Sequence, residues 1–171
     1  MKAIDAVRTS LNVAEGDLRF FEDMRDAPLT RPIPDGNHPM WILGHLALAE
    51  GRLHQMILGE TNPVAHWKPL FDWGTTPSDD PRVYPAFDDV LQTYRKLRSK
   101  TLSILDTMSD DELERPTPSP PPGLEQWFAT VGQTLLTIAS HQAFHCGQAS
   151  VARRAGGKPP GFVPSEELRN F

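Results

Sequence analysis

The chain contains little cysteine and no excess of positive charge. Its one cysteine, Cys146, excludes a disulfide bond within the chain. Seventeen lysines and arginines against 22 aspartates and glutamates give a net charge of −5, whereas nucleic-acid-binding domains carry a basic patch. No apolar run approaches the roughly 20 residues that a membrane-spanning helix needs. We therefore expect neither a nucleic-acid partner nor a membrane-spanning segment.

The first residues also lack the apolar core of a secretory signal peptide. Asp5 lies in the opening run Met-Lys-Ala-Ile-Asp-Ala, where such a peptide needs an apolar core. We therefore expect a cytoplasmic protein. Apolar residues make up 39% of the 171 residues, which suits one globular domain over residues 1–171 with its own core.

Proline divides the chain into segments. All 17 prolines lie outside four windows, which are residues 1–27, 40–62, 86–115 and 123–158. Because proline interrupts helices, these windows are where long helices can form. Apolar residues recur in them at alternating spacings of three and four, which is typical of helices that pack together. The stripe of the last window comprises Leu124, Trp127, Val131, Thr134, Ile138, His141, His145, Gln148 and Ala152.

Several residues are suited to the ends of these helices. Pro39 suits a first turn, Gly59 a C-terminal cap, and Gly156 with Gly157 a stop. The run Ser109-Asp-Asp-Glu112 fits a capping box that opens a short extra turn.

The connection from Gly59 to Pro85 is long enough to cross a bundle of helices about 30 Å in length, so the helices on either side of it can run parallel. The sequence thus predicts an all-α fold, a four-helix bundle with a long crossover between helices 2 and 3 in up-down-down-up order. The aromatic residues of this connection either anchor it over the bundle or line a substrate pocket; they are Trp67, Phe71 and Trp73, with His66 beside them.

Two histidines four residues apart are the main chemical signal. His141 and His145 fall on one face of a helix. The other residues of this stripe are typical of a helix face that packs into a protein core. A zinc protease of the same spacing needs a glutamate after the first histidine, and this chain has Gln142 there. His45, on the stripe of the second helix, stands at the same level if helices 2 and 4 are antiparallel. Three imidazoles with an open position are typical of a catalytic metal site.

The remaining histidines and Cys146 have plainer interpretations. We expect His38 to cap a helix or lie at the rim of the site, and His54 and His66 to lie on the surface. Cys146 points away from the stripe and is expected to be a buried, inert thiol.

Other polar residues near the histidines leave alternatives open. Gln148 either orients a ligand or is a core amide. The cationic residues Arg153, Arg154 and Lys158 either compensate the helix dipole or bind a carboxylate above the metal. Glu50 and Asp35 are the nearest acids by position, and we expect both to be solvated rather than to act as a general base.

Gly44 and Gly147, next to the histidines, either permit close backbone approach or reflect simple packing. Phe20, as an exposed aromatic residue beside the first stripe, would suit a dimer face.

Three segments carry a resemblance to a known family: Trp41-Ile-Leu-Gly-His45-Leu, His141-x3-His145-x-Gly-Gln148, and Arg153-Arg154. They resemble the DinB/YfiT-like metalloenzyme superfamily, the damage-inducible family and not the DNA polymerase of that name. The resemblance implies a four-helix bundle that binds a divalent metal through His45, His141 and His145. The metal in such proteins is zinc, nickel or iron, and homodimers are common. Relatives include S-transferases and isomerases that use low-molecular-weight thiols such as bacillithiol or mycothiol.

Three functions follow as hypotheses. A divalent ion with an open position lowers the pKa of a bound thiol or water, which permits thiol S-transfer to a small-molecule substrate or hydrolysis of an ester or amide. The resemblance favours S-transfer. The third is a non-catalytic stress-response protein that binds a metal or a small ligand. Imidazole ligands alone do not decide which metal binds.

Overall fold

The computed structural model describes residues 2–16, 18–159 and 161, and the part it describes is all-α. Five helices follow the four windows: α1 (Ala3–Gly16), α2 (Arg19–Glu22), α3 (Pro39–Leu58), α5 (Phe87–Asp106) and α7 (Val131–Ala155). Two further helices are short, α4 (Lys68–Phe71) and α6 (Asp110–Leu113), and three 3₁₀ turns cover Ala65–Trp67, Pro81–Val83 and Glu125–Trp127. Within the described residues there is no β-strand, and a single isolated bridge joins Pro116 to Thr130.

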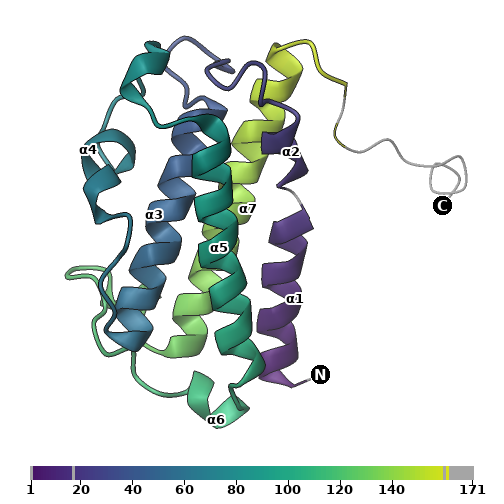
Figure 1. The fold of residues 1–171 in the computed structure, drawn as a ribbon. Helices are drawn as coiled ribbons and strands as arrows, with labels where there is room; N and C mark the ends of the chain where they lie inside the picture. Colours follow the sequence, from purple (N-terminus) through teal and green to yellow (C-terminus); the bar gives the residue numbers. More distant parts are fainter. Residues whose placement is uncertain (1, 17, 160, 162–171) are drawn as a thin grey trace, which may run out of the picture.

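The long helices α1, α3, α5 and α7 lie side by side (Figure 1). Helix α3 packs against both α5 and α7, and α1 packs against α7 and α5. Helices α3 and α5 both run from the top of the view to the bottom, while α1 and α7 run upward (Figure 1). The connection that joins α3 to α5 carries α4 and runs along the outside of α3, back to the top of the view (Figure 1). None of the helices in the described part of the chain is long and apolar enough to cross a membrane.

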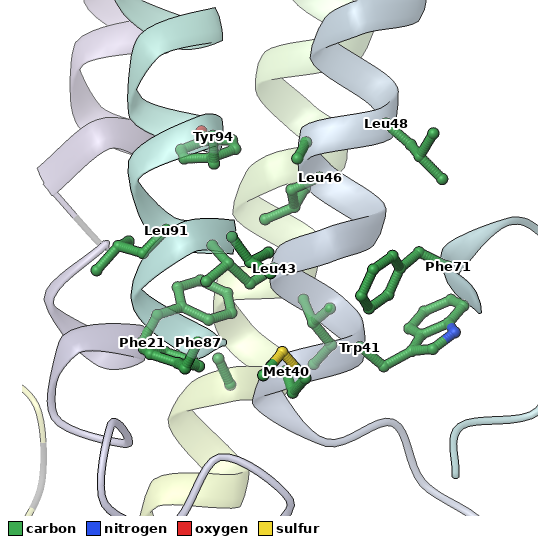
Figure 2. Packing of buried hydrophobic residues seen from close by; sticks show 14 of the residues in the cluster. Phe21, Met40, Trp41, Leu43, Leu46, Leu48, Phe71, Phe87, Leu91 and Tyr94 are labelled. Atoms are coloured by element: carbon green, nitrogen blue, oxygen red, sulfur yellow. The ribbon is translucent and has the colours of Figure 1, made fainter. Parts of the chain in front are cut away.

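Helix α3 is buried on nearly every side, from Pro39 through Leu48 without interruption. A helix in the middle of a protein needs apolar residues all round rather than on one stripe, which explains why its sequence pattern is the least regular of the four. Figure 2 shows Leu43, Phe87 and Tyr94 between α3 and α5, with Phe71 of α4 on the other side of α3. The connection from Gly59 is therefore anchored by aromatic residues, because Trp67 is 8% and Phe71 0% exposed.

The helix ends agree with the sequence in most places. His38 caps α3 by accepting a hydrogen bond from the backbone N–H of Trp41 through Nδ1. Gly59 ends the same helix at φ 71°, in the left-handed region that favours glycine. The capping box Ser109 to Glu112 opens α6 as expected.

Two windows differ from the prediction. The last helix begins at Val131 and not near Leu124, because Thr130 and Gln133 form a capping box there. Leu124 and Trp127 keep the apolar spacing but belong to the preceding loop and its 3₁₀ turn. In the first window, α1 ends at Gly16 and a separate short helix, α2, begins at Arg19.

Candidate metal centre

The structure brings His45, His141 and His145 together, as the sequence predicted. His45 projects from α3, and the other two project from α7, which packs antiparallel to it (Figure 1). The Nε2 atom of His141 lies 3.1 Å from the Nε2 atoms of both His45 and His145. One potential ligand atom from each ring lies within 4.8 Å of the other two. His45 and His145 are buried, and His141 is half-buried.

Two of the rings are held by hydrogen bonds at their outer nitrogens. The Nδ1–H of His45 donates to the backbone carbonyl of Phe71 at 2.8 Å, and that of His145 donates to Oε1 of Gln148 at 2.9 Å. Trp41 stacks on His45 with ring centroids 4.8 Å apart and an interplanar angle of 9°. Gln148 therefore orients a ring of the cluster, which was one of its two interpretations.

The inward nitrogens have too few hydrogens to satisfy one another. In the neutral form, an imidazole that carries its hydrogen on Nδ1 has a bare lone pair on Nε2. The Nε2 of His141 can donate one hydrogen at most, so it can satisfy only one of its two neighbours, His45 or His145. At least one of the two Nε2 lone pairs at 3.1 Å from His141 is therefore left without a hydrogen to accept.

Protonation does not relieve this arrangement at neutral pH. Burial and the neighbouring His145 and His45 lower the pKa of His141 to about 3, and burial lowers the pKa of His145 to about 4. Burial also lowers the pKa of His45. A cation is the partner that all three nitrogens can share, and ligands at about 2.1 Å from a tetrahedral zinc ion stand about 3.4 Å apart. The cluster thus fits a divalent ion.

A pocket of about 530 Å³ opens beside the cluster and has His45 and His141 in its wall. Its walls come from α3, from α7 and from two connections, the one that follows Gly59 and the proline-rich one before α7. The remaining lining residues are Ala49, Arg52, Met56, Asp72, Trp73, Pro121, Leu124, Trp127, Phe128, Thr137 and Ile138.

The only acidic residue among the described residues that line this pocket is Asp72. Its carboxylate accepts a hydrogen bond from Arg52, and this ion pair joins the crossover connection to α3. Arg52 follows His45 by seven residues and so shares its face of the helix, which is a signal the sequence offered for Arg52. Nothing in the sequence placed Asp72, because a loop residue carries no periodicity.

The acids expected near the site do not line it. Asp35 is exposed, as expected. The expectation for Glu50 was wrong: its side chain is 1% exposed and lies 2.6 Å from the guanidinium of Arg98, which is equally buried. Glu50 follows His45 by five residues, so it stands about 140° around the helix from the pocket.

His54 was also expected on the surface and is instead 1% exposed. Its Nε2–H donates to Oγ1 of Thr101 at 2.9 Å, and the Thr101 hydroxyl donates to Glu50 at 2.6 Å. Arg98 donates to Oε1 of Gln142, whose amide donates to a backbone carbonyl of α1 at 2.7 Å. These residues form a buried polar layer, which we define as Glu50, His54, Arg98, Thr101 and Gln142. These bonds offset part of the cost of burying the groups, while Nε and Nη1 of Arg98 have no hydrogen-bond partner among the described residues.

The cations at the end of α7 are engaged away from the pocket. Arg153 is 4% exposed and pairs with Asp23, and Lys158 pairs with Asp26. Neither lines the pocket in front of the histidines, so the structure gives no support to a carboxylate-binding rim made by them. Arg154 is exposed.

The glycines next to the histidines differ from one another. A Cβ atom at Gly44 would lie 2.4 Å from the ring of Phe71, so this position needs glycine for close packing. A Cβ atom at Gly147 would meet nothing within 4 Å among the described residues. Cys146 is buried and His66 is exposed, as expected, and Phe20 is partly buried against the core rather than fully exposed.

Comparison with known families agrees with this geometry. The model of the DinB superfamily matches residues 18–149, a span that includes all three clustered histidines. No curated protein sequence gives a significant match to the chain. Because the matched span covers most of the 171 residues, the chain belongs to the DinB superfamily.

Proposed function

We propose that this protein is a metal-dependent enzyme that binds one divalent ion through His45, His141 and His145, and that it transfers a low-molecular-weight thiol. The observation that carries the proposal is the convergence of three Nε2 atoms beside a pocket of about 530 Å³ whose wall includes His45 and His141. Three protein ligands beside a pocket leave a position for a substrate, whereas structural zinc sites have four ligands. Zinc, nickel and iron all accept imidazole ligands.

The residues around the cluster have separable roles in this proposal. When bound, the ion supplies a positive charge that lowers the pKa of a thiol or water. The Phe71 carbonyl and Gln148 hold two of the rings with their Nε2 atoms inward, which preserves the ligand tautomer. Asp72 is the one carboxylate in the described wall of the pocket, and its ion pair with Arg52 holds it against α3 in its charged form.

The helix directions support the up-down-down-up four-helix bundle that we propose for the fold (Figure 1). We also propose a homodimer. From Val131 to Ala152, α7 contains no acidic residue, lysine or arginine, yet Leu136, Phe144 and Val151 on it are 41%, 64% and 55% exposed. An uncharged face can pair with its own copy across a two-fold axis without bringing like charges together. Sedimentation of the purified protein measures this state directly.

Metal analysis tests the site itself. The purified protein is expected to hold about one divalent ion per chain, and His45→Ala, His141→Ala and His145→Ala are each expected to lose it. His66→Ala is the matched control, since His66 is exposed and lies outside the pocket. Full metal content in the His45 and His141 variants would refute the site.

Turnover tests the reaction. The metal-loaded protein, incubated with a panel of biological thiols and an electrophile, is expected to consume thiol and electrophile in equal amounts. Release of acid from an ester or amide instead would make it a hydrolase. Metal binding without any turnover would make it a binding protein.

Gln148 is expected to set the affinity for the ion through His145. Gln148→Ala leaves the Nδ1–H of His145 without its acceptor, and loss of such a partner typically weakens metal binding by about 10- to 100-fold. Gln148→Glu keeps an acceptor oxygen and is expected to retain the affinity. Competition with a chromophoric chelator for Zn²⁺ measures both, with Gln55→Ala on the exposed side of α3 as control. Equal Zn²⁺ affinities of the Gln148→Ala and Gln55→Ala variants would show that Gln148 does not set the affinity for the ion.

A further inference from the structure

The lining of the pocket beside the three histidines indicates which kind of ligand the pocket binds. Most of its wall is hydrocarbon or aromatic ring, contributed by Met56, Leu124, Phe128 and Ile138 among others. Pockets of about this size enclose a drug-sized molecule and recognise it through apolar walls with a few polar groups. The ligand therefore has an apolar body.

Two tryptophans in the wall are unusually accessible. Trp73 is 62% and Trp127 58% exposed, although a tryptophan side chain is normally buried for most of its area. They come from different connections, and each is fixed at its backbone: the N–H of Trp73 donates to Asp72 at 2.7 Å, and the carbonyl of Trp127 accepts from Thr137 at 2.8 Å. The backbone is thus held in place while the indole rings remain available for a ligand.

Outside the histidine cluster, the polar side chains of the wall are already paired. Arg52 and Asp72 neutralise one another, the Arg52 guanidinium lies 6.0 Å from the centre of the Trp73 ring, and the Thr137 hydroxyl is bonded to the chain. A ligand with many hydroxyl groups would lose its hydrogen bonds to water here and regain few, which is costly. Three neutral imidazoles leave the charge of a divalent ion uncompensated, so the one polar group that the site favours is an anion such as a thiolate.

We infer that the pocket binds a small molecule with a flat, aromatic body that packs on Trp73 and Trp127, and with a single anionic or thiol group directed at the histidine cluster. This inference rests on the proposed metal site for its anionic end. It assigns to this pocket an aromatic thiol or anion rather than a polyhydroxylated thiol.

The probes are naphthalene-2-thiol and 2-mercaptoethanol, titrated into the Co²⁺-loaded protein and followed by the absorption of the Co²⁺–thiolate bond. With both affinities referred to the thiolate form, naphthalene-2-thiol is expected to bind at least about 100-fold more tightly than 2-mercaptoethanol, because it alone buries an aromatic body. Trp73→Ala and Trp127→Ala are each expected to lower the affinity for naphthalene-2-thiol by about tenfold. The affinity for 2-mercaptoethanol is expected to change less than twofold in either variant. Val13→Ala, an exposed apolar residue of α1 outside the pocket, is the control.

Equilibrium dialysis of naphthalene-2-thiol against the chelator-treated protein separates this inference from the metal site. If the protein binds no Co²⁺ but the probe still binds and responds to both tryptophans, the pocket assignment holds and the proposed function fails. If Co²⁺ binds but the two thiols have equal affinity, or if either tryptophan variant binds the aromatic probe as wild type does, the inference is overturned.

Discussion

Replacing Arg98 by methionine is expected to lower the free energy of unfolding by about 3–5 kcal/mol. Arg98 and Glu50 are both 1% exposed, so their ion pair is shielded from bulk solvent. Burial already raises the pKa of Glu50 despite the nearby guanidinium, so this carboxylate depends on Arg98 for its charge. Urea denaturation of the metal-free protein at pH 7 measures the change.

The matched control lies one turn earlier on the same helix. Arg95 pairs with Glu22, but their side chains are 45% and 39% exposed, and surface pairs contribute about 0–1 kcal/mol. Arg95→Met is therefore expected to cost less than about 1 kcal/mol. The double variant Arg98→Met with Glu50→Leu is expected to recover part of the loss, because no unpaired charge remains buried. A cost for Arg98→Met no larger than that for Arg95→Met would show that the buried pair is not maintained in solution.

Replacing His141 by alanine is expected to leave the stability of the metal-free protein nearly unchanged and to abolish its stabilisation by Zn²⁺. In the metal-free protein the change removes the ring whose Nε2 lies 3.1 Å from two others, so the free energy of unfolding is expected to stay within about 1 kcal/mol of wild type. With Zn²⁺ at 100 times its dissociation constant, the wild type gains about 2.7 kcal/mol, and the variant is expected to gain almost none.

Unfolding midpoints in urea, with Zn²⁺ and with a chelator, measure both arms of this comparison. His66→Ala is expected to follow the wild type in both, since His66 is exposed and outside the pocket. An equal gain from Zn²⁺ in His141→Ala would mean that the ion binds elsewhere. A large loss in the metal-free variant would mean that the three rings support the fold rather than a ligand.

Much of the fold and the histidine cluster could be predicted from spacing alone. Proline-free windows located the long helices, and the i, i+4 pair on α7 with His45 on α3 gave the three converging rings. Periodicity failed where apolar spacing continues beyond a helix. Leu124 and Trp127 keep the register of α7, but the capping box at Thr130 ends the helix before it reaches them.

The buried polar layer could not be predicted from the sequence, for a different reason. Glu50 and His54 look like surface residues because α3 is surrounded on all sides and has no polar face to compare them with. Their partners Arg98 and Gln142 come from two other helices, and pairing between helices depends on rotations that one sequence does not reveal. Asp72 and Trp73 reach the pocket from a connection whose path is set by its aromatic anchors.

The position of Gln142 beside His141 has a consequence for how accurately the ring nitrogens align. Hydrocarbon contacts between helices tolerate sliding, and a slip of one turn would shift α7 by about 5.4 Å, more than the 4.8 Å that spans the three nitrogens. The bonds from Gln142 to Arg98 and to the carbonyl of Ala14 are directional and would break on such a slip. Polar groups that do not line the pocket thus help to fix the axial register of α7, and with it the height of two of the three imidazoles.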